Sequence, residues 1–231
     1  MKGEIIRRLI EDRAARRAVI LATNLKTGAE RLVYADCLGG EAVIGEAARE
    51  VFLSDRARIV ETAEGPIFLN VQNPPLRLVI TGAVHIAQML IPVATLAGFS
   101  VTVVDPRGGF ATEERFPGVE LHVAWPDEVA DKMAIDRRTA FVALTHDPKI
   151  DDPALRIALA GECFYIGALG SKKTHGGRVE RLTQAGIDAA SLERIHAPIG
   201  LAIGARSPAE IAISIMAEII NALRQGRIGR A

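Results

Sequence analysis

From about residue 76 onward, short apolar runs alternate with amphipathic stretches, a pattern that indicates buried strands separated by helices. The predicted strands are RLVIT (77–81), SVTVVD (100–105), VELHVA (119–124), TAFVALT (139–145) and CFYIGAL (163–169). The predicted helices are 84–97, 127–133, 151–160, 174–185 and a last one from the Ser207–Glu210 capping box to about Gln225. Strands that are apolar throughout are typical of a parallel sheet covered on both faces. We therefore predict an α/β fold, a doubly wound parallel sheet, for residues 76–231.

Residues 1–73 have a different pattern, in which polar turns separate pairs of apolar runs and indicate hairpins. The predicted elements are a helix at about 2–15, a hairpin that turns at Thr27 and Gly28, a helix near 42–54 and a second hairpin around Glu64, Gly65 and Pro66. Pro74 and Pro75 then form a linker, because proline has no N–H for a sheet ladder. The sequence thus predicts a small α+β domain before the doubly wound domain.

Charge and composition exclude several classes of protein. The 231 residues include 28 basic and 28 acidic side chains and only 4% aromatic residues, which argues against a nucleic-acid partner. The charged N-terminal stretch and the lack of a long apolar run argue against a signal peptide and a membrane span. Cys37 and Cys163 have no metal-site spacing and suit a reducing compartment. We expect a cytoplasmic protein without a metal site.

The stretch VITGAVHIAQML (79–90) resembles the strand, turn and helix that bind a dinucleotide. Gly82 and Ala87 fit the first and third positions of the G-x-G-x-x-G/A fingerprint, but Val84 replaces the second glycine. A β-branched side chain fills the space that a pyrophosphate needs and resists a positive φ. We predict that the turn keeps its geometry without binding NAD(P) tightly. Asp105, at the end of the next strand, either binds ribose hydroxyls or caps the turn before Pro106.

Three loops are expected to meet at one edge of the sheet. With strand order 3-2-1-4-5, the sheet reverses direction between the strands that end at Thr81 and Thr145, and ligands bind at such a crevice. The loops that converge there carry His85, His146, Asp147, Lys149, Lys172, Lys173 and His175. His146 and Asp147 either form a proton-transfer pair or start a turn before Pro148. A ligand site at this edge is the preferred interpretation.

The loop GALGSKKTH (167–175) has the composition of an anion site. Gly167 and Gly170 free the backbone, and Ser171 or Thr174 is suited to cap the following helix. Lys172 and Lys173 lie beside the positive end of that helix. The competing interpretation is a solvated lysine pair.

Six stretches within about residues 76–222 are distinctive: GAVHIAQ, VVDPR, ERFP, LTHDPKIDDPALR, YIGALGSKKTH and IHAPIGLAIGARSPAEIAISIMAEII. By its resemblance in these stretches the chain is identified as a member of the XdhC/CoxI family, the accessory factors that mature xanthine dehydrogenase and carbon monoxide dehydrogenase. The resemblance implies a Rossmann-like domain. It also implies a chaperone that binds molybdenum cofactor, protects it while a sulfido ligand is installed and passes it to an apo-enzyme.

The implied cargo is molybdopterin, with or without a nucleotide extension, and its phosphate suits the predicted anion site. The implied partners are an apo molybdenum hydroxylase and a sulfurtransferase. Val84 stands where family members carry glycine, and Cys37 is displaced from the family's cysteine position, so neither receives a cofactor role. The predicted cofactor-binding residues are Gly82, Ala83, His85, Asp105, Arg107, His146, Asp147, Gly167, Gly170, Ser171, Lys172, Lys173, Thr174 and His175.

The sequence leaves one question of function and one of assembly open. The alternative function is an NAD(P)-dependent oxidoreductase of unknown substrate, which Gly82, Ala87 and Asp105 favour and for which His146 or His175 would supply the proton. A maturation factor without catalytic residues of its own is preferred. The open question of assembly concerns the apolar last helix, which either packs wholly on its own sheet or pairs with a second copy in a symmetric homodimer.

Overall fold

The computed structural model describes residues 3–41 and 43–225, which divide between Pro74 and Pro75 into two compact units. Residues 2 and 42, at the predicted starts of two helices, and residues 226–231, at the end of the second predicted domain, lie outside the described residues.

The first unit is a four-stranded antiparallel sheet with helices. Its elements are α1 (Gly3–Ala14), β1 (Val19–Asn24), β2 (Glu30–Tyr34), the 3-10 helix η1 (Ala35–Gly40), α2 (Gly45–Ser54), β3 (Arg58–Val60) and β4 (Ile67–Gln72). The strand order is β2-β1-β4-β3, so both predicted hairpins are confirmed. A small core lies between α2 and the sheet and contains Ile20, Val33, Ala48, Val51 and Leu69.

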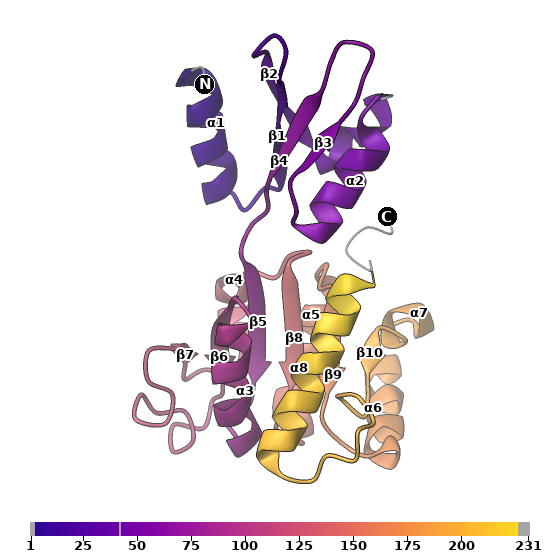
Figure 1. Ribbon diagram of the computed structural model, residues 1–231. Coiled ribbons are helices and arrows are strands. Elements are labelled where there is room, and N and C mark those ends of the chain that lie inside the picture. The colour runs from indigo at the N-terminus through magenta and orange to yellow at the C-terminus, as the bar shows by residue number, and fades with distance from the viewer. Residues whose placement is uncertain (1–2, 42, 226–231) are drawn as a thin grey trace. The chain divides into compact units, whose positions relative to one another are not determined.

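The second unit is a six-stranded parallel sheet flanked by helices (Figure 1). Its strands are β5 (Leu76–Thr81), β6 (Phe99–Val104), β7 (Glu120–His122), β8 (Thr139–Ala143), β9 (Tyr165–Ala168) and β10 (Ile195–His196). Its helices are α3 (His85–Leu96), η2 (Pro126–Val129), α4 (Ala130–Met133), α5 (Pro148–Ala160), α6 (Lys172–Gln184), α7 (Ala189–Leu192) and α8 (Pro208–Arg224).

The strand order β10-β9-β8-β5-β6-β7 confirms the predicted doubly wound sheet and its reversal between β5 and β8. Several elements differ from the prediction: α7 was not predicted, and α5 and α6 begin at Pro148 and Lys172 rather than at residues 151 and 174. The edge strand β10 was not predicted, because two residues are too short to show a periodic pattern. The predicted helix 127–133 is a 3-10 turn followed by one α-helical turn, which ends where Ala134 adopts a φ of 43°.

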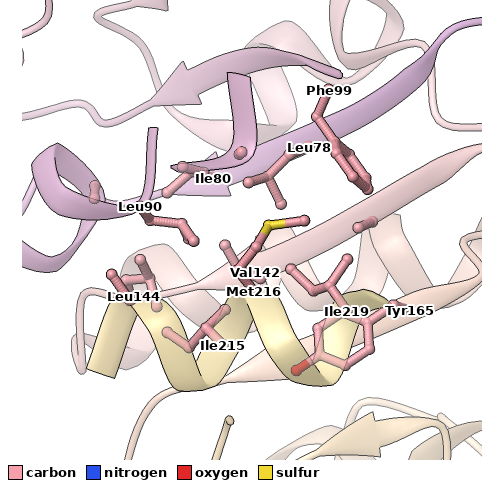
Figure 2. Close-up of a cluster of buried hydrophobic side chains, with 14 of the residues drawn as sticks. Leu78, Ile80, Leu90, Phe99, Val142, Leu144, Tyr165, Ile215, Met216 and Ile219 are labelled. Atoms are coloured by element: carbon pink, nitrogen blue, oxygen red, sulfur yellow. The ribbon is translucent and has the colours of Figure 1, made fainter. Parts of the chain in front are cut away.

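Each face of the sheet has its own core, because side chains alternate along each strand. Figure 1 shows α3 and α8 on one face, and α5 and α6 on the other. Leu78 and Ile80 of β5 belong to the cluster under α3 and α8, whereas Val79 belongs to the cluster under α5. Figure 2 shows Met216 and Ile219 of α8 among the strand side chains of the first cluster. The two layers hold the loops at the carboxyl ends of the strands in fixed positions.

The start of α8 and its packing follow from its sequence. Ser207 accepts a hydrogen bond from the Glu210 amide, and the Glu210 side chain accepts one from the Ser207 amide, which completes the predicted capping box. The apolar side chains then recur at helical spacing, and the buried ones are Ala212, Ile215, Met216, Ile219, Ala222 and Leu223. Within the described residues, no helix has both the length and the apolar character needed to cross a membrane.

A carboxylate joins α8 to the edge of the sheet. Glu218 accepts hydrogen bonds from the Tyr165 hydroxyl at 2.6 Å and from the Gly200 amide at 2.7 Å, and it pairs with Nδ1 of His196 at 2.9 Å. Burial opposes ionisation of Glu218, but these three partners outweigh it and hold its pKa below the ordinary value. The network fixes β9, β10 and the loop after β10 to one helix.

Candidate functional site

The turn after β5 keeps the strand-to-helix geometry that the sequence predicts. Gly82 has a φ of 112°, and a Cβ there would lie 2.8 Å from Cγ2 of Thr145, so this position needs glycine. Val84 has a φ of −98° and begins α3 in extended backbone. The expected conflict between Val84 and a positive φ therefore does not arise. Ala83 is buried and His85 is exposed at the first turn of α3.

Asp105 is fully engaged by its neighbours. Its Oδ1 accepts from the amide and Nε of Arg107, each at 2.9 Å, and its Oδ2 accepts from the Ala83 amide and from Nη2 of Arg107, each at 2.7 Å. A carboxylate offers about four lone-pair positions, so none is left for a ribose hydroxyl. Burial opposes ionisation, but these hydrogen bonds hold the pKa of Asp105 below its ordinary value. Asp105 thus ties the turn after β5 to the end of β6.

The loop after β6 closes over the same turn. Arg115 donates from Nη1 to the Ala83 carbonyl at 3.1 Å and from Nη2 to Oε1 of Gln88 at 3.0 Å. The guanidinium of Arg107 lies 4.4 Å from the centre of the Phe110 ring, and its hydrogen bond to Asp105 raises its pKa despite partial burial. The predicted binding residues Asp105 and Arg107 therefore pair with each other.

The loop after β8 is organised by a buried acid, Asp151. Thr145 donates to its Oδ1 from the hydroxyl at 2.6 Å, and the amide of His146 donates to its Oδ2 at 3.0 Å. Burial raises the pKa of Asp151, although these donors and the charge of Arg178 oppose the shift. His146 adopts a φ of 66° in the turn. Asp147 caps α5 by accepting from the Lys149 amide at 2.9 Å, as the turn interpretation predicted.

The loop after β9 leads into α6, which starts at Lys172 rather than at the predicted residue 174. Ser171 caps the helix by accepting from the Thr174 amide at 3.2 Å. Gly170 has a φ of 137°, and a Cβ there would approach Thr174 to 3.0 Å. Lys172 and Lys173 are exposed, and Nδ1 of His175 is buried without a hydrogen-bond partner among the described residues.

Gly167 has a packing role that the sequence did not indicate. It lies inside β9, where a Cβ would come within 2.5 Å of Cδ1 of Ile199. The strand therefore needs a glycine to admit the loop after β10. This position is separate from the helix start at Ser171.

A buried arginine, Arg178, is the residue that sequence reasoning missed. Its side chain is 2% exposed and lies one helical turn before the buried Leu182. Nη2 donates to the Leu169 carbonyl at 2.9 Å, and the nearest oxygen of Asp151 is 3.9 Å away. Within the described part of the chain, Nε and Nη1 have no acceptor. The sequence did offer one signal of this burial: Arg178 is four residues before the apolar Leu182 and so lies on the same face of the helix.

Arg178 lies in the wall of a cavity of about 260 Å³ at the carboxyl ends of β8 and β9. Arg181, in the same wall, is held by Asp152 through hydrogen bonds of 2.6 and 3.0 Å. The lining residues are His146, Pro148, Asp151, Asp152, Lys173, Thr174, Gly177, Arg178 and Arg181. The cavity therefore joins two of the three loops that the sequence places at the switch point, and its wall carries a lysine and two arginines.

Comparison with known proteins identifies the fold unit that builds this cavity. A model of the XdhC Rossmann domain matches residues 78–219. The chain belongs to the XdhC family. It is 34% identical over 180 residues to a probable xanthine dehydrogenase subunit from Bacillus subtilis (strain 168), covering 73% of this chain and 52% of that protein. It is 33% identical over 104 residues to the molybdenum cofactor insertion chaperone PaoD of Escherichia coli (strain K12), covering 45% of this chain and 33% of PaoD.

A crystal structure of a xanthine dehydrogenase from Bacillus halodurans has a similar fold, with a TM-score of 0.67 and 25% sequence identity. The similarity covers 96% of this chain and 65% of that chain. This XdhC protein spans about half the length of its Bacillus subtilis relative. All residues that line the cavity fall inside the matched XdhC domain.

The two cysteines of this XdhC protein, Cys37 and Cys163, are free thiols. Across residues 3–41 and 43–225, no three His, Cys, Asp or Glu side chains cluster as metal ligands. Cys37 is exposed in η1, where a hydrogen bond with Asp36 raises the pKa of its thiol. Burial raises the pKa of Cys163 to about 12. Both shifts disfavour the thiolate form that binds metal.

Proposed function

We propose that this chain is an accessory factor that binds molybdenum cofactor and delivers it to an apo molybdenum hydroxylase of the xanthine or carbon monoxide dehydrogenase type. The observation that carries the proposal is the cavity beside the start of α6, whose wall includes Lys173, Arg178 and Arg181. The names of the relatives in Bacillus subtilis and Escherichia coli support the same role.

The residues at this edge fit a cargo that carries a phosphate. The first turn of α6 is the positive end of the helix dipole, which favours an anion. Lys173 and the hydroxyl-bearing Thr174 lie in that turn and line the cavity. We assign the phosphate end of the cargo to this part of the crevice, and its pterin end to the side of His146 and the exposed His85.

The nicotinamide alternative has less support. A dinucleotide in its usual pose needs a carboxylate after the second strand to bind ribose hydroxyls. Asp105 occupies that position, but it is 0% exposed and accepts four hydrogen bonds from Ala83 and Arg107. Val84 in addition fills the space next to the turn, because its side chain packs against the core under α3.

The test is a cofactor-binding and transfer assay. Molybdenum cofactor released from a donor enzyme is mixed with the chain, and the retained pterin is measured by fluorescence after gel filtration. We expect retention, and faster activation of apo xanthine dehydrogenase than with free cofactor. The variant with Lys172→Ala and Lys173→Ala should retain less cofactor, whereas Arg156→Gln, on the exposed side of α5, should not change retention. Oxidation of NAD(P)H with a panel of carbonyl compounds, without pterin binding, would instead support the oxidoreductase.

Two further partners belong to the proposal. A sulfurtransferase would install the sulfido ligand while the cargo is held. A second copy of the chain would pair through α8, where Ile213 and Ile220 are 54% and 40% exposed and lie on one helix face, seven residues apart. Light scattering tests the dimer, since a mass equal to one chain would exclude it.

A further inference from the structure

We propose that Arg178 is the phosphate-binding residue of this cavity, and that its unpaired N–H groups donate to oxygens of a phosphate group. The site has a structural basis that exposed lysines lack. Arg178 is 2% exposed, yet Nε and Nη1 have no acceptor among the residues that the structure describes. Buried donors without an acceptor are rare in folded proteins, and those of a charged group are costly.

The surroundings of Arg178 do not supply the missing acceptor. Asp151 balances its charge, but the 3.9 Å separation is too long for a hydrogen bond. The oxygens of Asp151 instead accept from the Thr145 hydroxyl and amide and from the His146 amide. Burial lowers the pKa of Arg178 against the effect of Asp151. A bound anion would satisfy the guanidinium where Asp151 does not.

The position of the guanidinium is fixed before a ligand arrives. Nη2 is held by the Leu169 carbonyl at 2.9 Å, and the arginine lies on the second turn of α6. The helix thus brings together three features that bind phosphate: its own start, the exposed Lys173 and the buried Arg178. Because the free nitrogens do not reach solvent, an anion reaches them only if the cavity wall opens beside Arg178.

The identity of the ligand, though not the anion site itself, rests on the proposed function. Molybdopterin carries one phosphate, and a nucleotide extension adds a second one. Arg178 would therefore hold the cargo by its phosphate or pyrophosphate group.

Calorimetry with inorganic phosphate and with pyrophosphate tests the anion site in the full chain. We expect saturable binding by the native protein. Arg178→Lys keeps the charge but removes the planar guanidinium, so the affinity should fall about tenfold or more. Arg156→Gln removes a positive charge from the exposed side of α5 and should leave affinity unchanged. Unchanged phosphate affinity in a folded Arg178→Lys protein would overturn the inference.

A second measurement covers the case in which Arg178→Lys does not fold. In the native protein, the ¹⁵N–¹H signal of the assigned Arg178 Nε should shift as phosphate is added. A signal that stays in place at saturating phosphate overturns the inference.

Binding of the whole cofactor separates the two proposals. Retention of molybdenum cofactor without any phosphate or pyrophosphate binding would refute the Arg178 site and leave the proposed function standing. Phosphate binding at Arg178 without cofactor retention would support the site and refute the proposed cargo.

Discussion

Replacing Asp105 with asparagine should strongly destabilise the second unit. The carboxylate accepts four hydrogen bonds, two on each oxygen, from Ala83 and Arg107. An amide keeps one oxygen and turns an NH₂ group toward the other two donors, so two bonds are lost. A hydrogen bond to a charged group contributes about 1.5 to 3 kcal/mol, and breaking a buried ion pair costs about 3 to 5 kcal/mol. Arg107 is 33% exposed and regains some hydration, so we expect Asp105→Asn to cost about 3 to 5 kcal/mol.

The same substitution should change how stability depends on pH. Because the folded protein holds the pKa of Asp105 below its ordinary value, the carboxylate stabilises the fold above the unfolded pKa of about 3.9. That contribution is lost as the pH falls through the folded pKa. The free energy of unfolding of the native protein should therefore fall more steeply below about pH 4 than that of Asp105→Asn.

Urea denaturation followed by circular dichroism, from neutral pH down to about pH 2, measures both effects. Asp127→Asn is the matched control, because Asp127 is exposed in η2. It should change the free energy of unfolding by less than about 0.5 kcal/mol. The role assigned to Asp105 would be refuted by two results together. The free energy of unfolding of Asp105→Asn would fall by less than about 1 kcal/mol, and it would depend on pH below about 4 as it does in the native protein.

Three further substitutions test the local geometry. Gly82→Ala should lower the free energy of unfolding by about 2 to 4 kcal/mol in urea denaturation, because the methyl group would lie 2.8 Å from Thr145 at a φ of 112°. The control Gly28→Ala, at a φ of 71° with open space around it, should lower it by only about 1 kcal/mol. Tyr165→Phe removes the hydroxyl that donates to the partly buried Glu218 and should lower the free energy of unfolding by about 1 to 2 kcal/mol; no change would exclude that hydrogen bond as a stabilising contact. Val84→Gly should cost about 1 to 2 kcal/mol through lost packing and chain entropy and should raise nucleotide affinity in calorimetry; tight NAD binding by the native protein would contradict this account.

Much of the second unit could be predicted because its strands are long and apolar throughout. Val79 and Ile80 point to opposite faces of β5 and both are fully buried, and a strand buried on both faces is typical of a parallel sheet covered by helices on each side. The strand at 195–196 could not be predicted, since two residues carry no period. Its place depends on Glu218, which lies in another element and binds His196.

The candidate site was predictable at the level of loops and less so at the level of side chains. The switch-point rule placed His146 and Lys173 at one edge, and both line the cavity. Asp105 and Arg107 are two residues apart, and nothing in their spacing shows that they bind each other rather than a ligand. Arg178 was missed because a single charged residue on a helix is ordinarily exposed, and its spacing to Leu182 is a weak signal until α5 is seen to pack against α6.

The cavity is built from one uninterrupted stretch of chain. Every residue in its wall falls between His146 and Arg181, a stretch that follows directly after β8 and includes β9, and neither strand lies at an edge of the sheet. Such a stretch behaves as a module: transplanted with β8 and its neighbouring loops into another doubly wound sheet, it would bring its whole anion-binding wall with it. The connection through Asp105 does not share this property, because it needs two segments that the chain brings together only after folding.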